Sequence, residues 1–343
     1  MSKEHWQAAE GKIRTRWAQH VNLETPLPEY PRPQMVRESW LNLNGLWDYA
    51  VVPRDQESVN DFDGHIFVPF AIESALSGVM KPLLPDQQLW YRRSFNVPED
   101  WQGQRVMLNF GAVDWETTVW CNQVELGSHQ GGFDPFSFDL TSCLNFDGEN
   151  ELLVAVRDPS NEGRQERGKQ TLKPGFVFYT AVSGIWQTVW LEPLPETSID
   201  RLYLTPDIDH ESLKIQIDCN QDSSGLTLLA EAKNGNEVIA IKTGPAGQAL
   251  ELPVVDPHLW SPDDPFLYDL EISLWQGRAC LDRATSYFGM RKISLERDEK
   301  GVQRICLNNK FVFQYGPLDQ GYWPDGLYTA PTCLLYTSPS PRD

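Results

Sequence analysis

Residues 108–140 constrain the fold most, because apolar and polar side chains alternate along two runs around and within them. The first run ends at Phe110 and the second begins near Thr118. The alternating positions are Val106, Leu108 and Phe110, then Thr118, Trp120, Val124 and Leu126. A period of two is typical of strands with one buried face. The stretch therefore predicts two strands of a β-sandwich rather than a helix.

Two short segments in this stretch predict changes of chain direction. Cys121-Asn122-Gln123 supplies a turn between the two strands. Gly131-Gly132 reaches positive φ at little cost, which permits a sharp loop that carries Phe133 and Phe136 inward.

The remainder of the N-terminal half continues the strand pattern. Gly, Pro, Asp and Asn separate short alternating segments at 66–70, 89–97, 105–110, 117–121, 152–157 and 188–191. So many short strands predict a sandwich of the jelly-roll type. Between 157 and 183 the alternation stops and the chain becomes polar, and a loop of that length is usually functional or mobile.

A second all-β region is expected after residue 196. Alternation in LYLTP, LKIQIDC, LTLLAEA, LELPV and LYDLEISLW, with a closing strand around Phe288, gives about seven strands in roughly a hundred residues. That number suits an immunoglobulin-like sandwich. After Glu296 the run ICLNNKFVF predicts a hairpin that turns at Asn308-Asn309, since asparagine tolerates left-handed backbone geometry.

The charge balance excludes two classes of partner. The chain has 29 Lys and Arg against 48 Asp and Glu, a formal net charge of -19. Nucleic acids and anionic membranes both require clustered basic residues, so neither is expected as a partner. The N-terminus has no apolar run long enough for a signal-peptide core, and no window approaches ~18 apolar residues. A cytoplasmic protein is the expectation.

The metal-binding and redox-active residue types are scattered. Six cysteines show neither CxxC spacing nor Cys/His clustering, so no zinc site or disulfide scaffold is predicted and the thiols should be reduced. His129 precedes Gly131-Gly132, but no second His or Cys stands at metal spacing, which favours a structural loop histidine. Most of the 13 tryptophans, such as Trp47, Trp120 and Trp190, fall on strand patterns and are expected in the core, although exposed ones could form a lectin-like platform.

Five further runs surround the stretch 108–140 in a distinctive order: LWYRRSFNVP before it, then NELLVAVRDP, SGIWQTVWLEP, HLWSPDDPFLY and FGMRKISL. In order and spacing the chain resembles the non-catalytic N-terminal half of glycoside hydrolase family 2, which includes β-galactosidases, β-glucuronidases and β-mannosidases. The resemblance implies a parent O-glycosidase that acts on β-glycosides with retention and without an organic cofactor. It leaves open whether the full-length protein is an oligomer.

The resemblance also implies an order of domains. We expect an N-terminal arm at 1–30, a jelly-roll, galactose-binding-like domain at 31–196 and an immunoglobulin-like sandwich at 197–295. Residues 296–332 would contain the first strand of a (β/α)8 barrel and its first loop at the catalytic face. The run CLLYTSPSPRD at 333–343 does not continue this pattern and looks like translated transposase-adapter DNA, so we expect it to be an artefact.

Retaining glycosidases use two carboxyl groups about 5 to 5.5 Å apart. In the family both are glutamates of later barrel strands, so the resemblance implies no catalytic carboxylate within residues 1–332 and an inactive chain. Asn150-Glu151 and Asn161-Glu162 imitate the family's Asn-Glu dipeptide, but both precede any barrel. No metal ligand set is predicted either.

The resemblance does suggest substrate-binding residues. Asp158 opens the polar loop, where β-galactosidase-like members place an acidic residue at the pocket edge; the alternative is a turn-initiating Asp before Pro159. In the expected barrel loop, polar groups beside aromatic rings suit a sugar, and the candidates are Asp319, Gln320, Tyr322, Trp323 and Asp325. Alternatively, Tyr322 and Trp323 cap the barrel mouth. The family's Asn and His after the strand's Gly are replaced by Pro317-Leu318-Asp319-Gln320, so sugar specificity cannot be carried over.

Two functions from different classes fit these observations. The first is the N-terminal part of an O-glycosyl hydrolase. The second is a stand-alone carbohydrate-binding or adhesion protein of two sandwiches. Residues 308–332 favour the first, because a binding protein has no use for a hairpin, a barrel strand and an aromatic polar loop without a barrel.

Overall fold

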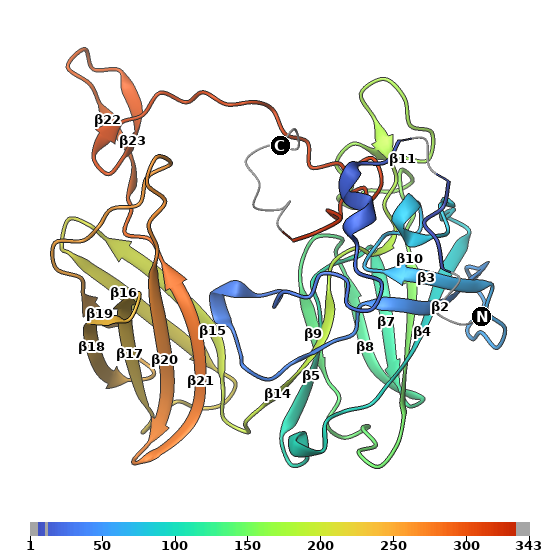
Figure 1. Ribbon diagram of the computed structural model, residues 1–343, viewed down its shortest axis with the longest axis horizontal. Helices are drawn as coiled ribbons and strands as arrows, with labels where there is room; N and C mark the ends of the chain where they lie inside the picture. The colour runs from blue at the N-terminus through green and yellow to red at the C-terminus, as the bar shows by residue number, and fades with distance from the viewer. Residues whose placement is uncertain (1–5, 11–12, 334–343) are drawn as a thin grey trace. The chain divides into compact units, whose positions relative to one another are not determined.

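The computed structural model describes residues 6–10 and 13–333, and those residues contain strands and short 3-10 helices but no α-helix. The chain forms two compact units (Figure 1). Unit 1 comprises residues 1–31, 39–193 and 319–343, and unit 2 comprises residues 32–38 and 194–318. No helix in the described ranges is long and apolar enough to cross a membrane. The all-β class expected from the alternation is therefore confirmed.

Unit 1 is a sandwich of two antiparallel sheets. The larger has the order β3-β2-β4-β10-β7-β8 and the smaller β1-β14-β5-β9. The strands are β1 Leu41–Asn42, β2 Gly45–Pro53, β3 Gly64–Val68, β4 Gln87–Phe95, β5 Arg105–Phe110, β6 Val113–Asp114, β7 Glu116–Cys121, β8 Val124–Gln130, β9 Phe136–Asp139, β10 Asn150–Arg157, β11 Gln170–Thr171, β12 Tyr179–Thr180, β13 Gly184–Ile185 and β14 Val189–Leu194. The 3-10 helices are η2 Arg16–His20, η4 Ala75–Ser77 and η5 Glu99–Trp101.

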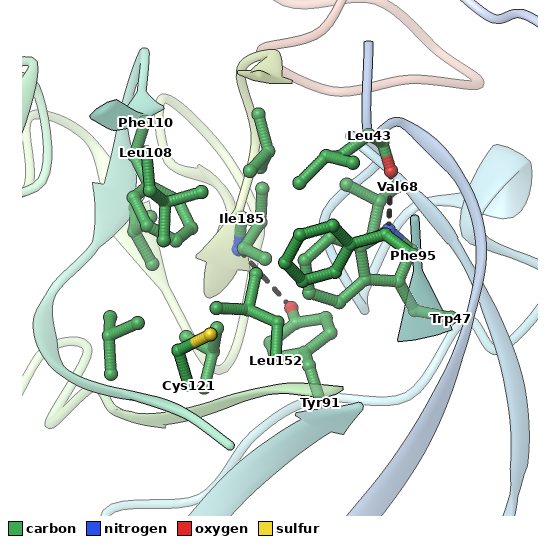
Figure 2. Close-up of a cluster of buried hydrophobic side chains, with 14 of the residues drawn as sticks. Leu43, Trp47, Val68, Tyr91, Phe95, Leu108, Phe110, Cys121, Leu152 and Ile185 are labelled. Carbon is green, nitrogen blue, oxygen red and sulfur yellow. Dashed lines mark hydrogen bonds between the residues drawn. The ribbon is translucent and has the colours of Figure 1, made fainter. Parts of the chain in front are cut away.

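The core of unit 1 follows from the period of two in its strands. Every second residue of β10 faces the smaller sheet, and Leu152, Val154 and Val156 are fully buried. Figure 2 shows the resulting cluster, in which the Trp47 indole donates to the Leu43 carbonyl at 2.8 Å. The hydroxyl of Tyr91 accepts the N–H of Ile185 at 3.2 Å in the same cluster. The Trp47 indole and the Tyr91 hydroxyl are thus both hydrogen-bonded, as burial of a polar group requires.

The turn expected at Cys121-Asn122-Gln123 is confirmed as a two-residue hairpin. β7 ends at Cys121, β8 begins at Val124, and these two residues pair across the turn. Asn122 and Gln123 have φ of 49° and 69°, which is the geometry of a type I′ turn.

Unit 2 is a seven-stranded sandwich, as the sequence predicts, with sheet orders β15-β16-β19 and β18-β17-β20-β21. A separate small sheet has the order β22-β23-β24. The elements are η3 Pro33–Met35, β15 Ile199–Asp207, β16 Ser212–Cys219, β17 Thr227–Asn234, β18 Glu237–Pro245, β19 Leu250–Pro253, β20 Tyr268–Gln276, β21 Ala279–Phe288, β22 Ile293–Arg297, β23 Gln303–Leu307 and β24 Lys310–Phe311. The predicted hairpin turn is present, with Asn308 and Asn309 at φ of 50° and 62°.

Residues 312–317, between the predicted hairpin and the predicted first barrel loop, form no regular strand in the structure. A barrel strand gains its hydrogen bonds from parallel neighbours, so this segment does not become a strand by itself. Trp323 and Leu327 then form an isolated antiparallel bridge. The expected artefact at 333–343 lies outside the described residues except for Cys333.

The prediction for the tryptophans holds for two of the three named. Trp47 and Trp190 are 1% and 4% exposed and belong to the interior. Trp120 was wrongly expected in the core: it is half-buried on the outer face of β7. A strand pattern cannot tell the two faces of a sheet apart when both carry apolar residues, and β7 is such a strand.

Candidate functional site

Asp158 opens the polar loop, which is defined here as residues 158–183. It directly follows β10, and its side chain is only 3% exposed. Its Oδ1 accepts the N–H of Ser160 at 2.6 Å, and its Oδ2 accepts the hydroxyl of Ser183 at 2.7 Å. Asp158 therefore initiates a turn and also joins the beginning of the loop to its end.

Glu73 binds the end of the polar loop at Ser183, the residue that also donates to Asp158. Its carboxylate accepts the N–H of Ser183 at 2.9 Å and the N–H of Leu83 at 3.3 Å. The side chain is buried, and burial raises the pKa of Glu73 to about 8, against the hydrogen bonds from Ser183, which lower it. Ser183 thus donates to two carboxyl groups, through its N–H to Glu73 and its hydroxyl to Asp158.

Asp114 is the third buried carboxyl group, at 2% exposed. Its Oδ2 accepts the side-chain amide of Gln170 at 3.1 Å, and the Gln170 side-chain oxygen accepts the N–H of Val182 at 2.6 Å. Gly132 lies so close that an added Cβ would be 2.7 Å from the Asp114 carboxyl carbon, so this position requires glycine. Asp114 thereby fastens the middle of the polar loop.

We call Glu73, Asp114 and Asp158 the acidic cluster. No Lys or Arg forms an ion pair with any of the three in the part of the chain that the structure describes. Burial raises the pKa of all three, and their mutual repulsion adds to the shift of Asp114 and Glu73. Protonated carboxyl groups are therefore favoured here.

Aromatic rings pack against the polar loop beside the acidic cluster. Tyr322, one of the predicted substrate residues, donates to the Thr180 carbonyl at 2.7 Å and stacks on Tyr179 with ring centroids 4.5 Å apart. Tyr328 is the neighbouring ring, 4.8 Å from Tyr322 and 5.1 Å from Trp186. Burial raises the pKa of both tyrosines. Tyr322 therefore contacts the polar loop at Thr180, close to Ser183, which donates to Asp158.

Asp325 and Trp323 face a different part of unit 1. Asp325 is fully buried, and its Oδ2 accepts both the N–H and the hydroxyl of Thr15 at 2.8 and 2.6 Å. Trp323 makes an edge contact with Trp17 at 5.9 Å. Both residues tie the segment after residue 319 to the N-terminal segment.

Asp319 and Gln320 are the predicted substrate residues that remain exposed. Within the described residues, the side chain of Asp319 accepts one hydrogen bond, from the nearby N–H of Gly321 at 2.8 Å. At the tip of the polar loop, Phe176 and Phe178 are 103% and 53% exposed. These side chains are free to contact a ligand, whereas Asp158 and Asp325 are not.

The acidic cluster does not offer the chemistry of a glycosidase. A retaining pair needs one ionised carboxylate and one acid that both reach the sugar, but these three groups are buried and accept hydrogen bonds from backbone and side-chain donors of the protein. No group of three or more His, Cys, Asp or Glu able to hold a metal occurs among residues 6–10 and 13–333. The arrangement can hold a loop in place and can take up protons.

The sequence interpretation missed Glu73, Asp114, Gln170 and Ser183. Glu73 does give a signal, because it is a lone acidic residue in the apolar run VPFAIESAL, with no basic residue in the run. Nothing in the sequence indicates that Gln170 would join Asp114 to Val182, since that contact depends on the fold of the loop.

Comparison with known proteins gives two family matches in tandem. Residues 30–195 match the model described as glycosyl hydrolases family 2, sugar binding domain. Residues 197–291 match the model described as glycosyl hydrolases family 2. Only residue 196 separates the two matches, and they correspond to the two sandwiches.

Curated relatives of the chain include a beta-galactosidase of Thermoanaerobacter pseudethanolicus, 28% identical over 76% of this chain and 36% of its own length. A beta-glucuronidase of Paenibacillus borealis is 25% identical over 83% of this chain and 50% of its own length. The chain therefore spans half or less of the length of these relatives.

Among solved structures, a β-glucuronidase of Ruminococcus gnavus in complex with an N1-substituted uronic isofagomine superposes with a TM-score of 0.72. The sequence identity is 21%, and the match covers 88% of this chain and 53% of that one. The same enzyme in complex with D-glucuronic acid gives a TM-score of 0.66. At this identity the likeness establishes the fold.

Proposed function

Because this chain belongs to glycosyl hydrolase family 2, we propose that it is the non-catalytic N-terminal part of a retaining glycosidase that acts on β-glycosides. The observation that carries the proposal is the tandem family match, with the sugar-binding domain at 30–195 followed directly by the second domain at 197–291. The two curated relatives are two or more times as long as the region that they match, and they are named beta-galactosidase and beta-glucuronidase.

In this proposal the acid and the nucleophile lie outside residues 1–332. Support comes from the state of the buried carboxyl groups in unit 1. Glu73, Asp114 and Asp158 are occupied by loop N–H, hydroxyl and amide donors, and burial raises the pKa of each. A nucleophile must be ionised and must reach the anomeric carbon, so this cluster does not suit the role.

We further propose that some of the predicted substrate residues contact the sugar directly and that the others act indirectly. Asp319 and Gln320 are exposed and would contact sugar hydroxyls directly, together with the exposed tip of the polar loop at Phe176 and Phe178. Asp158, Tyr322 and Trp323 would act indirectly, by holding the polar loop and the segment after residue 319 in place. Asp325 has the same indirect role, through Thr15.

The experiment is an activity assay of the 343-residue chain on nitrophenyl β-D-galactoside, β-D-glucuronide, β-D-mannoside and β-D-glucoside. We expect no turnover above buffer, while circular dichroism and cooperative unfolding show that both sandwiches are folded. Turnover that Glu73→Gln or Asp158→Asn abolishes would contradict the proposal.

The stereochemical part of the proposal requires the complete protein. Following the product by proton NMR should show the β-anomer first, because a double displacement retains configuration. Initial release of the α-anomer would exclude the retaining mechanism.

A further inference from the structure

The polar loop at 158–183 has little backbone structure of its own. Its strands are β11 and β12, which pair with each other in parallel over two residues (Figure 1). Most residues from 161 to 178 are exposed. The last residue of the loop, Ser183, accepts the N–H of Ile72 at a long 3.5 Å. The attachment of the loop to the rest of unit 1 therefore depends largely on side chains.

Three of these side-chain contacts end on the buried carboxyl groups of the acidic cluster. Ser183 donates its N–H to Glu73 at 2.9 Å and its hydroxyl to Asp158 at 2.7 Å. Gln170 donates its side-chain amide to Asp114 at 3.1 Å. The three acids are 6%, 3% and 2% exposed, and they lie between β3 and η4, after β10 and in β6, respectively. The loop is thus bound by carboxyl groups from three separate parts of unit 1.

The groups that surround the acidic cluster do not neutralise it. The loop has four basic residues that form no ion pair with the three carboxyl groups in the part of the chain that the structure describes, namely Arg164, Arg167, Lys169 and Lys173. Tyr91 and Tyr322 face Glu73, and Tyr322 and Tyr328 face Asp114. Burial raises the pKa of all three tyrosines, so their hydroxyls stay neutral between pH 5 and pH 8.

Two further titratable groups lie near the loop. Glu166 accepts the N–H of Gly132 at 3.1 Å, and backbone hydrogen bonds lower the pKa of Glu166. Glu166 therefore stays ionised between pH 5 and pH 8, and its constant negative charge repels Asp114. His129 interacts with Glu166, and imidazole side chains change charge in this pH range. A test of the acidic cluster must therefore control for His129.

We propose that the acidic cluster is a pH-sensitive switch for the polar loop, which stays bound to unit 1 while Glu73 is protonated and opens when Glu73 ionises. This switch does not depend on the proposed function above. In the closed loop an ionised Glu73 is a buried anion without a cation, and it lies near Asp158 and Asp114, so its charge costs free energy. Opening lets water hydrate the carboxylate. Loops with few buried apolar contacts open at lower free energy than the core of a domain.

Proton binding sets the expected size of the effect. Burial raises the pKa of Glu73 to about 8 in the closed loop, whereas the unperturbed value is 4.5 and applies when the open loop exposes the group to water. Between these values the closed loop carries one more proton than the open loop. The equilibrium constant for opening therefore rises with pH, by up to about tenfold per pH unit. The rise is about 70-fold between pH 5 and pH 7, and it levels off above pH 8.

The test is hydrogen exchange of the 343-residue chain between pH 5 and pH 7, followed by mass spectrometry and corrected for the intrinsic exchange rate at each pH. Peptides that contain Val182 and Ser183 report on the loop, because the N–H groups of these residues donate to Gln170 and Glu73. Their protection should fall about 70-fold from pH 5 to pH 7. At each pH they should exchange faster than β4, which opens only with the sandwich core. Constant protection of the loop, or exchange no faster than that of β4, would overturn the proposal.

Two variants identify the group that titrates. Glu73→Gln keeps the shape of the side chain but does not titrate, so the fall in loop protection should shrink to less than about threefold. His129→Gln is the matched control and should keep the fall of about 70-fold, because His129 interacts with Glu166. An unchanged fall in Glu73→Gln, or its loss in His129→Gln, would assign the pH dependence to another group and overturn the proposal. The comparison of the loop with β4 uses the parent chain, so it tests the switch even if Glu73→Gln does not fold.

Discussion

In unit 2 the buried carboxylate of Asp282 lies against a buried guanidinium, whereas the three buried carboxyl groups of the acidic cluster in unit 1 have no cationic partner in the described residues. Arg37 and Asp282 have side chains 6% and 3% exposed and form a two-bond contact, with Nη2 to Oδ2 at 3.0 Å. The comparison shows two ways to bury a carboxyl group. One pairs it with a guanidinium, and the other raises its pKa by burial and uses it as a hydrogen-bonding hub.

The largest effect is expected when the pair in unit 2 is broken. Arg37→Met should destabilise unit 2 by about 3 to 5 kcal/mol, because it leaves Asp282 charged, buried and without a cation. Urea unfolding with fluorescence detection would measure this loss. Arg201→Met is the control, since Arg201 and Asp200 form an exposed pair at 3.8 Å and should contribute little. An equal effect of both substitutions would remove the distinction between buried and exposed pairs.

The acidic cluster should instead make the stability of unit 1 depend on pH. The pKa of Glu73 is about 8 in the folded chain and 4.5 in its unperturbed state, so the folded state binds the additional proton between these values. The contribution of Glu73 to the free energy of unfolding is therefore greatest below pH 4.5, and it falls as the pH rises toward 8. One additional proton corresponds to about 1.4 kcal/mol per pH unit, and with partial ionisation at both ends of the range this gives about 2.5 kcal/mol between pH 5 and pH 7.

Glu73→Gln provides the matched comparison for this pH effect. Glutamine has nearly the same shape but does not titrate, so the fall in stability between pH 5 and pH 7 should become shallower. Thermal unfolding of both proteins across this range is the measurement. If the stability of unit 1 in the parent chain rose from pH 5 to pH 7, that result would contradict the raised pKa of Glu73.

A smaller effect is expected at the residue that joins two members of the acidic cluster. Ser183→Ala removes the hydroxyl that donates to Asp158 at 2.7 Å but keeps the N–H that donates to Glu73. The loss should be about 1 to 2 kcal/mol, the usual cost of a buried hydrogen bond to a carboxyl group. Limited proteolysis within the polar loop should become faster. Ser224→Ala, at an exposed turn of unit 2, is the control and should change neither measurement.

The smallest effect on stability is expected at the exposed candidates for substrate contact. Asp319→Asn should change the free energy of unfolding by less than about 0.5 kcal/mol, because the side chain is exposed and bonds only its own turn. In the proposed full-length glycosidase the same change should raise KM. A large loss of stability would place Asp319 with Asp158 and Asp325 as a residue that holds its segment in place.

The comparison also explains which features the sequence could predict. Alternation along strands reports which face is buried, so both sandwiches and the turns at Asn122 and Asn308 followed from local patterns. The role of Trp120 did not follow, because a tryptophan on a strand looks the same on either face. The hub role of Glu73 did not follow either, because it depends on Ser183, which is 110 residues away in the chain.

Asp158 also makes one contact that the sequence predicts and one that it does not. The sequence left two readings open, a turn initiator or a pocket-edge residue that accepts hydrogen bonds from a sugar. Its bond to the N–H of Ser160 is the local contact that the turn reading requires. Its bond to Ser183 links positions 25 residues apart, and only the folded loop brings them together.

The most direct test of this account is the titration of Glu73 itself. Carbon-13 NMR of the chain labelled at glutamate carboxyl carbons, with Glu73→Gln to assign the resonance, would give its pKa in the folded state. The account predicts a midpoint near pH 8, at which most of the other carboxyl groups have already ionised. A midpoint near the unperturbed value of 4.5 would mean that Glu73 is ionised at neutral pH, and the acidic cluster would then not be the protonated hub described here.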